Sequence, residues 1–149
     1  MGRKNINERN KNMNIRDLSQ YYYISKNIEK RKRRLEELNC SIISSSKISE
    51  IKVDSSNHGD DPTSRIGIKI AELKTLLEED YRKLINEELK INEYINTIDS
   101  EEIKFIVISR FIEFNTWDDI AKDMNYSRPV PYQKLKKYLK ERNKRKCLD

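Results

Sequence analysis

The sequence predicts an all-α protein with a long N-terminal antiparallel helical hairpin, coiled-coil-like, and a C-terminal helix-turn-helix domain. Three observations predict this fold class. Glycine and proline each occur only 3 times in 149 residues, so few residues interrupt helices. Apolar residues recur at seven-residue spacing over two long segments. A third segment, from residue 99 onward, carries the caps and turns of shorter helices.

Composition restricts the class of protein further. Charged residues (38%) outnumber hydrophobic ones (36%), which predicts an elongated molecule without one large core. No run approaches the roughly eighteen apolar residues of a membrane span, and the N-terminus is polar and basic. We therefore expect a cytoplasmic protein with no membrane contact.

The residues that usually carry chemistry are few and scattered. Cys40 and Cys147 lack metal-ligand spacing and are expected to be free thiols. His58, the single histidine, lies in a polar loop segment without convergent acids, bases or ligands. No glycine-rich phosphate loop occurs. We expect no enzymatic activity, no metal and no cofactor.

The N-terminal half reads as an arm followed by a helix. Residues 1–15 form a basic segment, expected to be disordered. Asp17 is a plausible N-cap of a helix reaching about Ser44. Its apolar seam is broken by Arg31 and consists of Tyr21, Ile24, Ile28, Leu35, Leu38 and Ile42. The basic run at residues 30–34 is either a solvated face or a phosphate contact.

A second long helix is expected after a serine-rich flexible loop at about residues 44–64. It runs from Arg65 to about Thr97. Its seam consists of Ile66, Ile70, Leu73, Leu77, Tyr81, Leu84, Ile91, Ile95 and Ile98. Neither helix of the 16–98 segment can bury its stripe alone, so the two either fold against each other or pair with a second chain.

Residues 99–143 predict a compact module with a turn between its last two helices. Asp99 and Glu102 have the spacing of a capping box, and Thr116 caps the next helix. The residues expected to point inward are Ile103, Ile106, Val107, Phe111, Trp117, Ile120, Ala121 and Met124. A turn is expected at residues 113–115, and Asn125 suits a left-handed position in the second turn.

The last helix is the candidate for reading DNA. It is expected from Pro131 to about Arg142, with Ser127 as a possible cap and Tyr132, Leu135 and Leu139 facing inward. Val130 precedes a proline, which disfavours helical backbone there and lengthens the turn. A basic tail is expected at residues 144–149.

Positive charge is concentrated around this helix. Residues 128–146 carry nine Lys or Arg and one acid, a local charge of +8 against +6 for the whole chain. Binding of duplex DNA through phosphate contacts requires such a concentration; the alternative is a solvated basic end. Gln133 could bond an adenine edge, and Lys136 or Lys137 a guanine or a phosphate. The candidate DNA-binding residues are Arg128, Tyr132, Gln133, Lys134, Lys136, Lys137 and Lys140.

The segment from Ile103 to Tyr126 also carries a family resemblance. With Arg110-Phe111-Ile112, the Trp117–Ala121 run and Asn125-Tyr126-Ser127, it resembles the phage and prophage transcriptional regulators of the RinA and ArpU kind. Their C-terminal module is similar to region four of sigma-70 family factors. The resemblance implies binding of promoter DNA beside RNA polymerase and control of late or lytic genes.

Two other functions stay open. One is a DNA-packaging assembly protein similar to a phage terminase small subunit, in which the long helices would build a ring. The other is a helical adaptor that binds a protein partner. Self-association through the long helices is compatible with all three functions.

Overall fold

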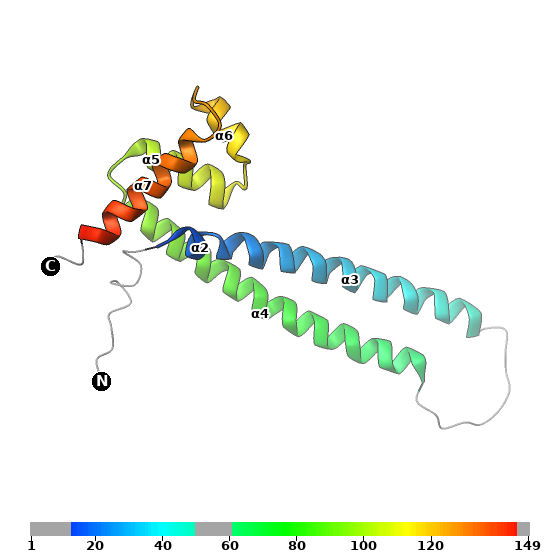
Figure 1. Cartoon of the computed structure of the whole chain (residues 1–149). Coiled ribbons are helices and arrows are strands. Elements are labelled where there is room, and N and C mark those ends of the chain that lie inside the picture. Colours follow the sequence, from blue (N-terminus) through cyan, green and yellow to red (C-terminus); the bar gives the residue numbers. More distant parts are fainter. Residues whose placement is uncertain (1–12, 50–60, 146–149) are drawn as a thin grey trace, which may run out of the picture. The chain divides into compact units, whose positions relative to one another are not determined.

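The computed structural model describes residues 13–49 and 61–145, and all secondary structure in these ranges is helical, as predicted (Figure 1). The remaining residues, including His58 and Cys147, lie outside the described part. The elements are α2 (Ile15–Leu18), α3 (Gln20–Ser49), α4 (Pro62–Asn96), α5 (Glu101–Val107), the π-helix η1 (Ile108–Ile112), α6 (Trp117–Asp123) and α7 (Val130–Arg145).

Contacts divide the chain into two units at a different place from the predicted boundary after residue 98. The arm unit is Ile24–Lys83, which holds most of α3 and the first part of α4. The head unit combines the described residues up to Tyr23 with Leu84 and everything after it. The sequence predicts a head that begins at residue 99, so it misses two segments of this unit.

The folded chain begins before the end of the predicted disordered arm. Met13 is buried in the head unit, and Asn14 rather than Asp17 is the N-cap. The Asn14 side chain accepts a hydrogen bond from the Asp17 backbone amide at 2.9 Å, and the Asp17 carboxylate accepts one from the Asn14 amide at 3.1 Å. This reciprocal capping box satisfies two amides that a helix start leaves unpaired. Asp17 therefore lies three residues inside the structure it was predicted to cap.

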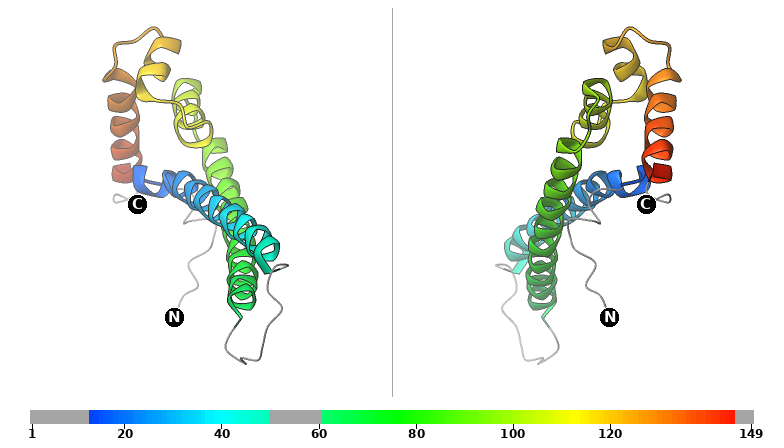
Figure 2. Two further views of the ribbon diagram at one scale, coloured as in Figure 1. Left: turned by 90° about the vertical axis from the view of Figure 1, so that its right-hand side faces the viewer. Right: turned by 90° about the vertical axis from the view of Figure 1, so that its left-hand side faces the viewer.

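Within the arm unit, α3 and α4 run in opposite directions side by side (Figures 1 and 2). Their predicted seams supply the buried residues Ile28, Leu38, Ile70 and Leu77. Tyr81 is an exception, because its side chain is 38% exposed while the neighbouring Asp80 is buried.

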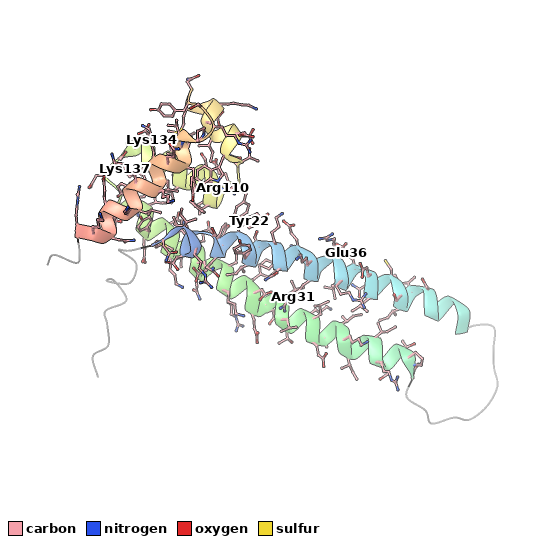
Figure 3. All side chains as sticks on the ribbon, viewed as in Figure 1. Tyr22, Arg31, Glu36, Arg110, Lys134 and Lys137 are labelled. Atoms are coloured by element: carbon pink, nitrogen blue, oxygen red, sulfur yellow. The ribbon has the colours of Figure 1, made fainter. Side chains whose placement is uncertain are left out.

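Arg31, which interrupts the apolar seam of α3, is matched by Asp80 of α4. Its Nε lies 3.1 Å from Asp80 Oδ2, and Figure 3 shows Arg31 on the side of α3 toward α4. Nη1 of Arg31 and Oδ2 of Asp80 have no aligned hydrogen-bond partner among the described residues. The pair is therefore held by charge more than by hydrogen-bond geometry.

The helices of the arm are longer than predicted at the ends that face the serine-rich segment. Ser44 is helical, and its hydroxyl donates to the Cys40 carbonyl at 3.0 Å, so this serine is compatible with the helix. At the start of α4, the Asp61 carboxylate accepts from the Thr63 amide at 3.1 Å, and Pro62 occupies the first helical position. The part of the predicted loop at residues 50–60 lies outside the described residues.

The head unit has one apolar core that draws on segments far apart in the sequence. Each fully buried aliphatic side chain stabilises the fold by about 1.5–3 kcal/mol relative to an exposed one. The most deeply buried aliphatic residues are Leu18, Ile91, Ile98, Ile106, Val107, Ile120 and Leu135. Because Leu18 comes from α2 and Ile91 from α4, the three C-terminal helices do not form the core alone.

Helix α5 begins one residue later than predicted. Ser100, not Asp99, is the N-cap, and its hydroxyl accepts from the Ile103 amide at 3.4 Å. Glu102 does not reach back to close a capping box, since its carboxylate is bound elsewhere in the head unit. The predicted inward stripe of Ile103, Ile106 and Val107 is confirmed.

The π-helix η1 follows α5 directly, and the predicted turn at residues 113–115 contains a left-handed residue. The Glu113 amide donates to the Ile108 carbonyl at 3.0 Å, five residues back. Phe114 then has φ 62°, which is unfavourable for a bulky side chain. Its ring lies 5.6 Å from that of Tyr21 and 5.1 Å from that of Tyr22, so aromatic contacts offset the backbone strain.

Candidate nucleic-acid interface

The turn between α6 and α7 positions the candidate interface. Thr116 caps α6, as predicted, by accepting from the Asp119 amide at 3.2 Å. Asn125 has φ 56°, the left-handed conformation predicted for it. The Tyr126 amide donates to the Ala121 carbonyl at 2.8 Å, which closes the end of α6.

Helix α7 begins one residue earlier than predicted. Val130 is already helical, and its amide donates to the Ser127 backbone carbonyl at 3.0 Å. Ser127 thus contributes its carbonyl at this turn, whereas a side-chain cap was predicted. Pro131 fits because the first turn of a helix needs no backbone N–H from it. Helix α7 also continues to Arg145, beyond the predicted end.

Helix α7 has one buried and one exposed face. Pro131, Leu135 and Leu139 are buried, whereas Tyr132, which was predicted to face inward, is 39% exposed. The exposed face consists of Gln133, Lys136, Lys137 and Lys140. Within the described residues, Lys136 and Lys140 have no ion pair, and the Lys137 ammonium lies 4.0 Å from Glu141. These four predicted site residues therefore share one solvated surface.

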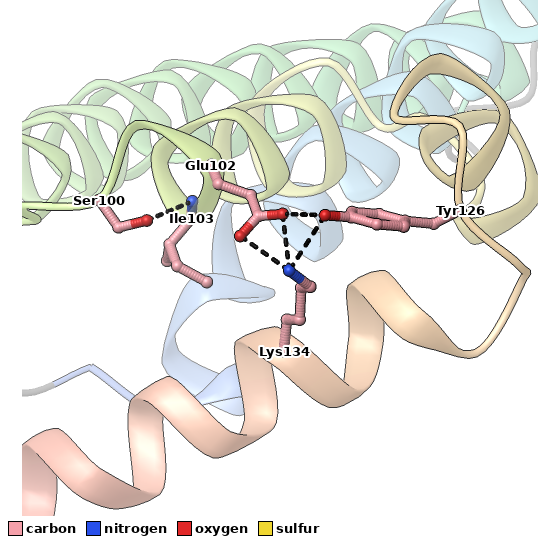
Figure 4. A network of polar contacts seen from close by, with 5 residues as sticks. All are labelled: Ser100, Glu102, Ile103, Tyr126 and Lys134. Atoms are coloured by element: carbon pink, nitrogen blue, oxygen red, sulfur yellow. Dashed lines mark hydrogen bonds and ion pairs between the residues drawn. The ribbon is translucent and has the colours of Figure 1, made fainter.

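Lys134 is a predicted site residue that the structure places elsewhere. Its ammonium lies 2.8 and 3.0 Å from the two carboxylate oxygens of Glu102 and 3.2 Å from the hydroxyl of Tyr126 (Figure 4). The Tyr126 hydroxyl also donates to Glu102 at 2.8 Å. Hydrogen bonds from Lys134 and Tyr126 lower the pKa of Glu102, and the bond to Glu102 raises the pKa of Lys134. Lys134 thus ties α7 to α5 and is not part of the solvated face.

Arg128 and Tyr132 each contact a residue in the first turn of α6. Arg128 Nε lies 2.7 Å from Asp118 Oδ1, although the Arg128 side chain is 78% exposed. The Tyr132 ring meets the Trp117 indole edge to face at 5.3 Å. With Pro129, the residues Trp117, Arg128 and Tyr132 line an open hollow of about 270 Å³.

Two arginines, Arg142 of α7 and Arg110 of η1, have structural roles in the head unit. Arg142 donates to the Thr97 carbonyl at 3.2 Å and to the Tyr138 hydroxyl at 2.7 Å. Its guanidinium lies 5.0 Å from the ring centroid of Tyr94, whose pKa burial raises to about 12. Arg110 donates to the Asn115 carbonyl at 2.8 Å and stacks over Trp117 at 5.2 Å. Within residues 128–146, Lys134 and Arg128 are paired with carboxylates and Arg142 is held by Thr97 and Tyr138. The local charge of +8 therefore overstates the charge available to a ligand.

A second hollow of about 290 Å³ lies where α2 and the start of α3 meet the η1–α6 turn. It was not predicted, because its walls come from segments about ninety residues apart and from the left-handed Phe114. Only the tyrosine run at residues 21–23 signals it in the sequence. Its lining residues are Ser19, Tyr22, Tyr23, Arg110, Phe111, Phe114 and Thr116.

The described residues do not meet the requirements for a metal site, a disulfide or a membrane-spanning helix. Among the residues it describes, no group of three or more His, Cys, Asp or Glu side chains is arranged to hold a metal ion. Cys40 is an exposed free thiol on α3. Across residues 13–49 and 61–145, no helix combines the length and apolar character needed to cross a membrane.

Comparison with known proteins places the chain in a family. No curated protein and no solved structure matches it. A family described as "Protein of unknown function (DUF1492)" matches residues 42–143, which begin within α3 and end within α7. Since this segment is more than half of the 149 residues, the chain belongs to the DUF1492 family.

Proposed function

We propose that this protein is a DNA-binding transcriptional regulator of the phage type. In this proposal α6, the turn at Asn125 and α7 form a helix-turn-helix, and α7 enters the major groove. The arm unit is an antiparallel helical hairpin that presents a surface for self-association.

The two-faced character of α7 is the observation that carries the proposal. Leu135 and Leu139 anchor one face in the core, so the other face is held rigidly in solvent. Lys136 and Lys140 lie four residues apart on that face, one helical turn from each other, and Gln133 precedes them by one turn. Lysines at this spacing suit phosphate contacts along a groove, and a glutamine beside them suits the edge of adenine.

The resemblance to RinA and ArpU regulators adds a protein partner to the proposal. A regulator with a module similar to region four of sigma-70 factors acts beside RNA polymerase, on late or lytic promoters.

Exposed aliphatic side chains on the arm unit support self-association. Ile68 is 58% exposed and Leu76 is 42% exposed, both on α4. A second copy of the chain can cover them. Sedimentation velocity of the full chain separates the two DNA-binding functions, because a monomer or dimer fits a regulator and a high-order ring fits a packaging protein.

The test is a salt series of duplex binding by fluorescence anisotropy. The probes are fragments from the genomic neighbourhood of the coding region and shuffled duplexes of equal composition. Between about 50 and 200 mM salt, affinity for the preferred fragment should fall steeply. Equal affinity for every shuffled duplex would contradict a sequence-specific regulator.

A matched pair of double variants locates the interface. Replacing Lys136 and Lys140 by alanine should reduce the salt slope by about 0.9 for each lost phosphate contact. Replacing the exposed Lys69 and Lys74 of the arm unit by alanine removes the same charge and should leave the slope unchanged. Equal losses in the two double variants would show that net charge, not the α7 face, determines binding.

A further inference from the structure

The contacts proposed above for DNA do not involve the 270 Å³ hollow beside the start of α7. Its four lining residues are Trp117, Arg128, Pro129 and Tyr132, and its wall is almost wholly apolar. It is a shallow, widely open depression with a volume of about 270 Å³. Such an opening admits a small apolar substituent on the edge of a planar ring.

The walls of the hollow are fixed in place by contacts within the head unit. Trp117 is held between Tyr132 at 5.3 Å and the Arg110 guanidinium at 5.2 Å. On the other side, the 2.7 Å ion pair between Arg128 and Asp118 ties the turn to α6. The contacts of Trp117 with Tyr132 and Arg110 therefore position the aromatic wall of the hollow.

The hollow lies next to the solvated face of α7. Tyr132 and Lys136 are four residues apart, so they lie on successive turns of the same edge of the helix. Gln133 is the next residue after Tyr132. A duplex that contacts Lys136 and Gln133 would bring a base edge to the hollow.

We propose that this hollow binds the 5-methyl group of thymine in the major groove. The inference rests on the proposed function, because it requires α7 to lie in that groove. The thymine methyl is the apolar group that base pairs present there, whereas the other groove features are hydrogen-bond donors and acceptors. An apolar wall with the exposed ammonium of Lys136 one turn further along α7 fits a methyl group that lies close to phosphates. At the position next to the base contacted by Gln133, the protein would thus prefer thymine over the other bases.

Replacement of thymine by uracil tests the inference directly, since uracil pairs identically and lacks only the methyl group. The probe is the preferred genomic fragment, amplified with either thymidine or deoxyuridine triphosphate. Loss of one buried methyl should weaken binding of the full chain about fourfold, which is ~0.8 kcal/mol. Tyr132→Ser should abolish the preference for thymine, and Tyr132→Leu, which keeps an apolar wall, should retain it.

Phe105→Ala is the matched control. Phe105 is 40% exposed, close to the 39% of Tyr132, but lies on α5 outside the hollow, so this variant should keep the preference. An unchanged helical circular-dichroism spectrum and thermal transition of Tyr132→Ser show that the variant is folded. Equal binding of both fragments by the unmodified protein, with salt dependence intact, overturns the inference and leaves the proposed function standing. A preference that persists in Tyr132→Ser also overturns it, and failure to bind either fragment contradicts the proposed function itself.

Discussion

Replacing Arg31 by leucine should destabilise the arm unit more than replacing Asp80 by leucine. Asp80 is 7% exposed, and after loss of Arg31 its nearest cation is the Lys83 ammonium at 3.8 Å. The Arg31 side chain is 33% exposed, so it can turn its guanidinium to water when Asp80 is absent. Loss of Arg31 therefore leaves a buried carboxylate without its partner, whereas loss of Asp80 leaves a guanidinium that can reach water.

The magnitudes follow from the geometry of the pair. At 3.1 Å and an effective dielectric of about 20, the attraction is about 5 kcal/mol, most of which desolvation offsets. Loss of one partner of a buried pair costs about 3–5 kcal/mol. We expect about 3 kcal/mol for Arg31→Leu and about 1–2 kcal/mol for Asp80→Leu, because only the former leaves a buried carboxylate. The double leucine variant should be about as stable as the wild type or more stable, since apolar packing replaces an imperfectly bonded pair.

Urea unfolding followed by circular dichroism at 222 nm measures these free energies, and the cycle should give a coupling of at least about 2 kcal/mol. Arg34→Leu and Glu37→Leu are the controls, because this pair at 2.8 Å is about 60% exposed on both sides and should contribute less than about 1 kcal/mol. Additive effects of the Arg31 and Asp80 variants would refute the reasoning. Sedimentation of the double variant tests a second expectation, that the pair fixes the register of the seam and that its loss promotes other associations.

Three further predictions concern the head unit. Glu102→Gln should lower the unfolding free energy by up to about 1 kcal/mol at pH 7. The lowered pKa of Glu102 stabilises the fold above its unfolded value of 4.5. This difference should be lost as the pH falls through the lowered pKa of the folded state, and thermal unfolding across a pH series from 7 into the acid range checks it. Phe114→Gly should be less destabilising than Phe114→Ala by about 1 kcal/mol in urea unfolding, because glycine relieves the strain of φ 62° that alanine retains. Asn125→Val should cost about 1–2 kcal/mol and Asn125→Gly almost nothing; equal losses would contradict a left-handed residue in this turn.

The helical fold and most of its buried positions were predictable because they follow from local periodicity. The seams of both long helices and the stripe of α5 depend on spacing along one element, which the sequence displays directly. Thr116 and Asn125 were identified for a similar reason, since cap and turn preferences act within a few residues.

The errors arise where distant segments meet. Asp80, not Tyr81, enters the seam because Arg31 of the other helix pairs with it, and no pattern within α4 indicates that partner. Lys134 lies on the edge of α7 that meets Glu102. The spacing of residues within α7 gives no sign of this distant partner, so Lys134 was predicted to be as exposed as Lys136. Caps displaced by one to three residues reflect competition between adjacent polar side chains, as between Asp99 and Ser100.

The head unit is assembled from two stretches of chain, with the arm unit inserted between them. A fragment that starts at Leu84 keeps α5, α6 and α7 but loses Leu18, whose side chain is wholly enclosed. Shortened versions intended for crystallisation or binding studies therefore need the leading segment from Met13 rejoined to Leu84 by a linker. Because Ile24–Lys83 belongs to the other unit, a change in the length of this insertion leaves the residues that enclose Leu18 in place.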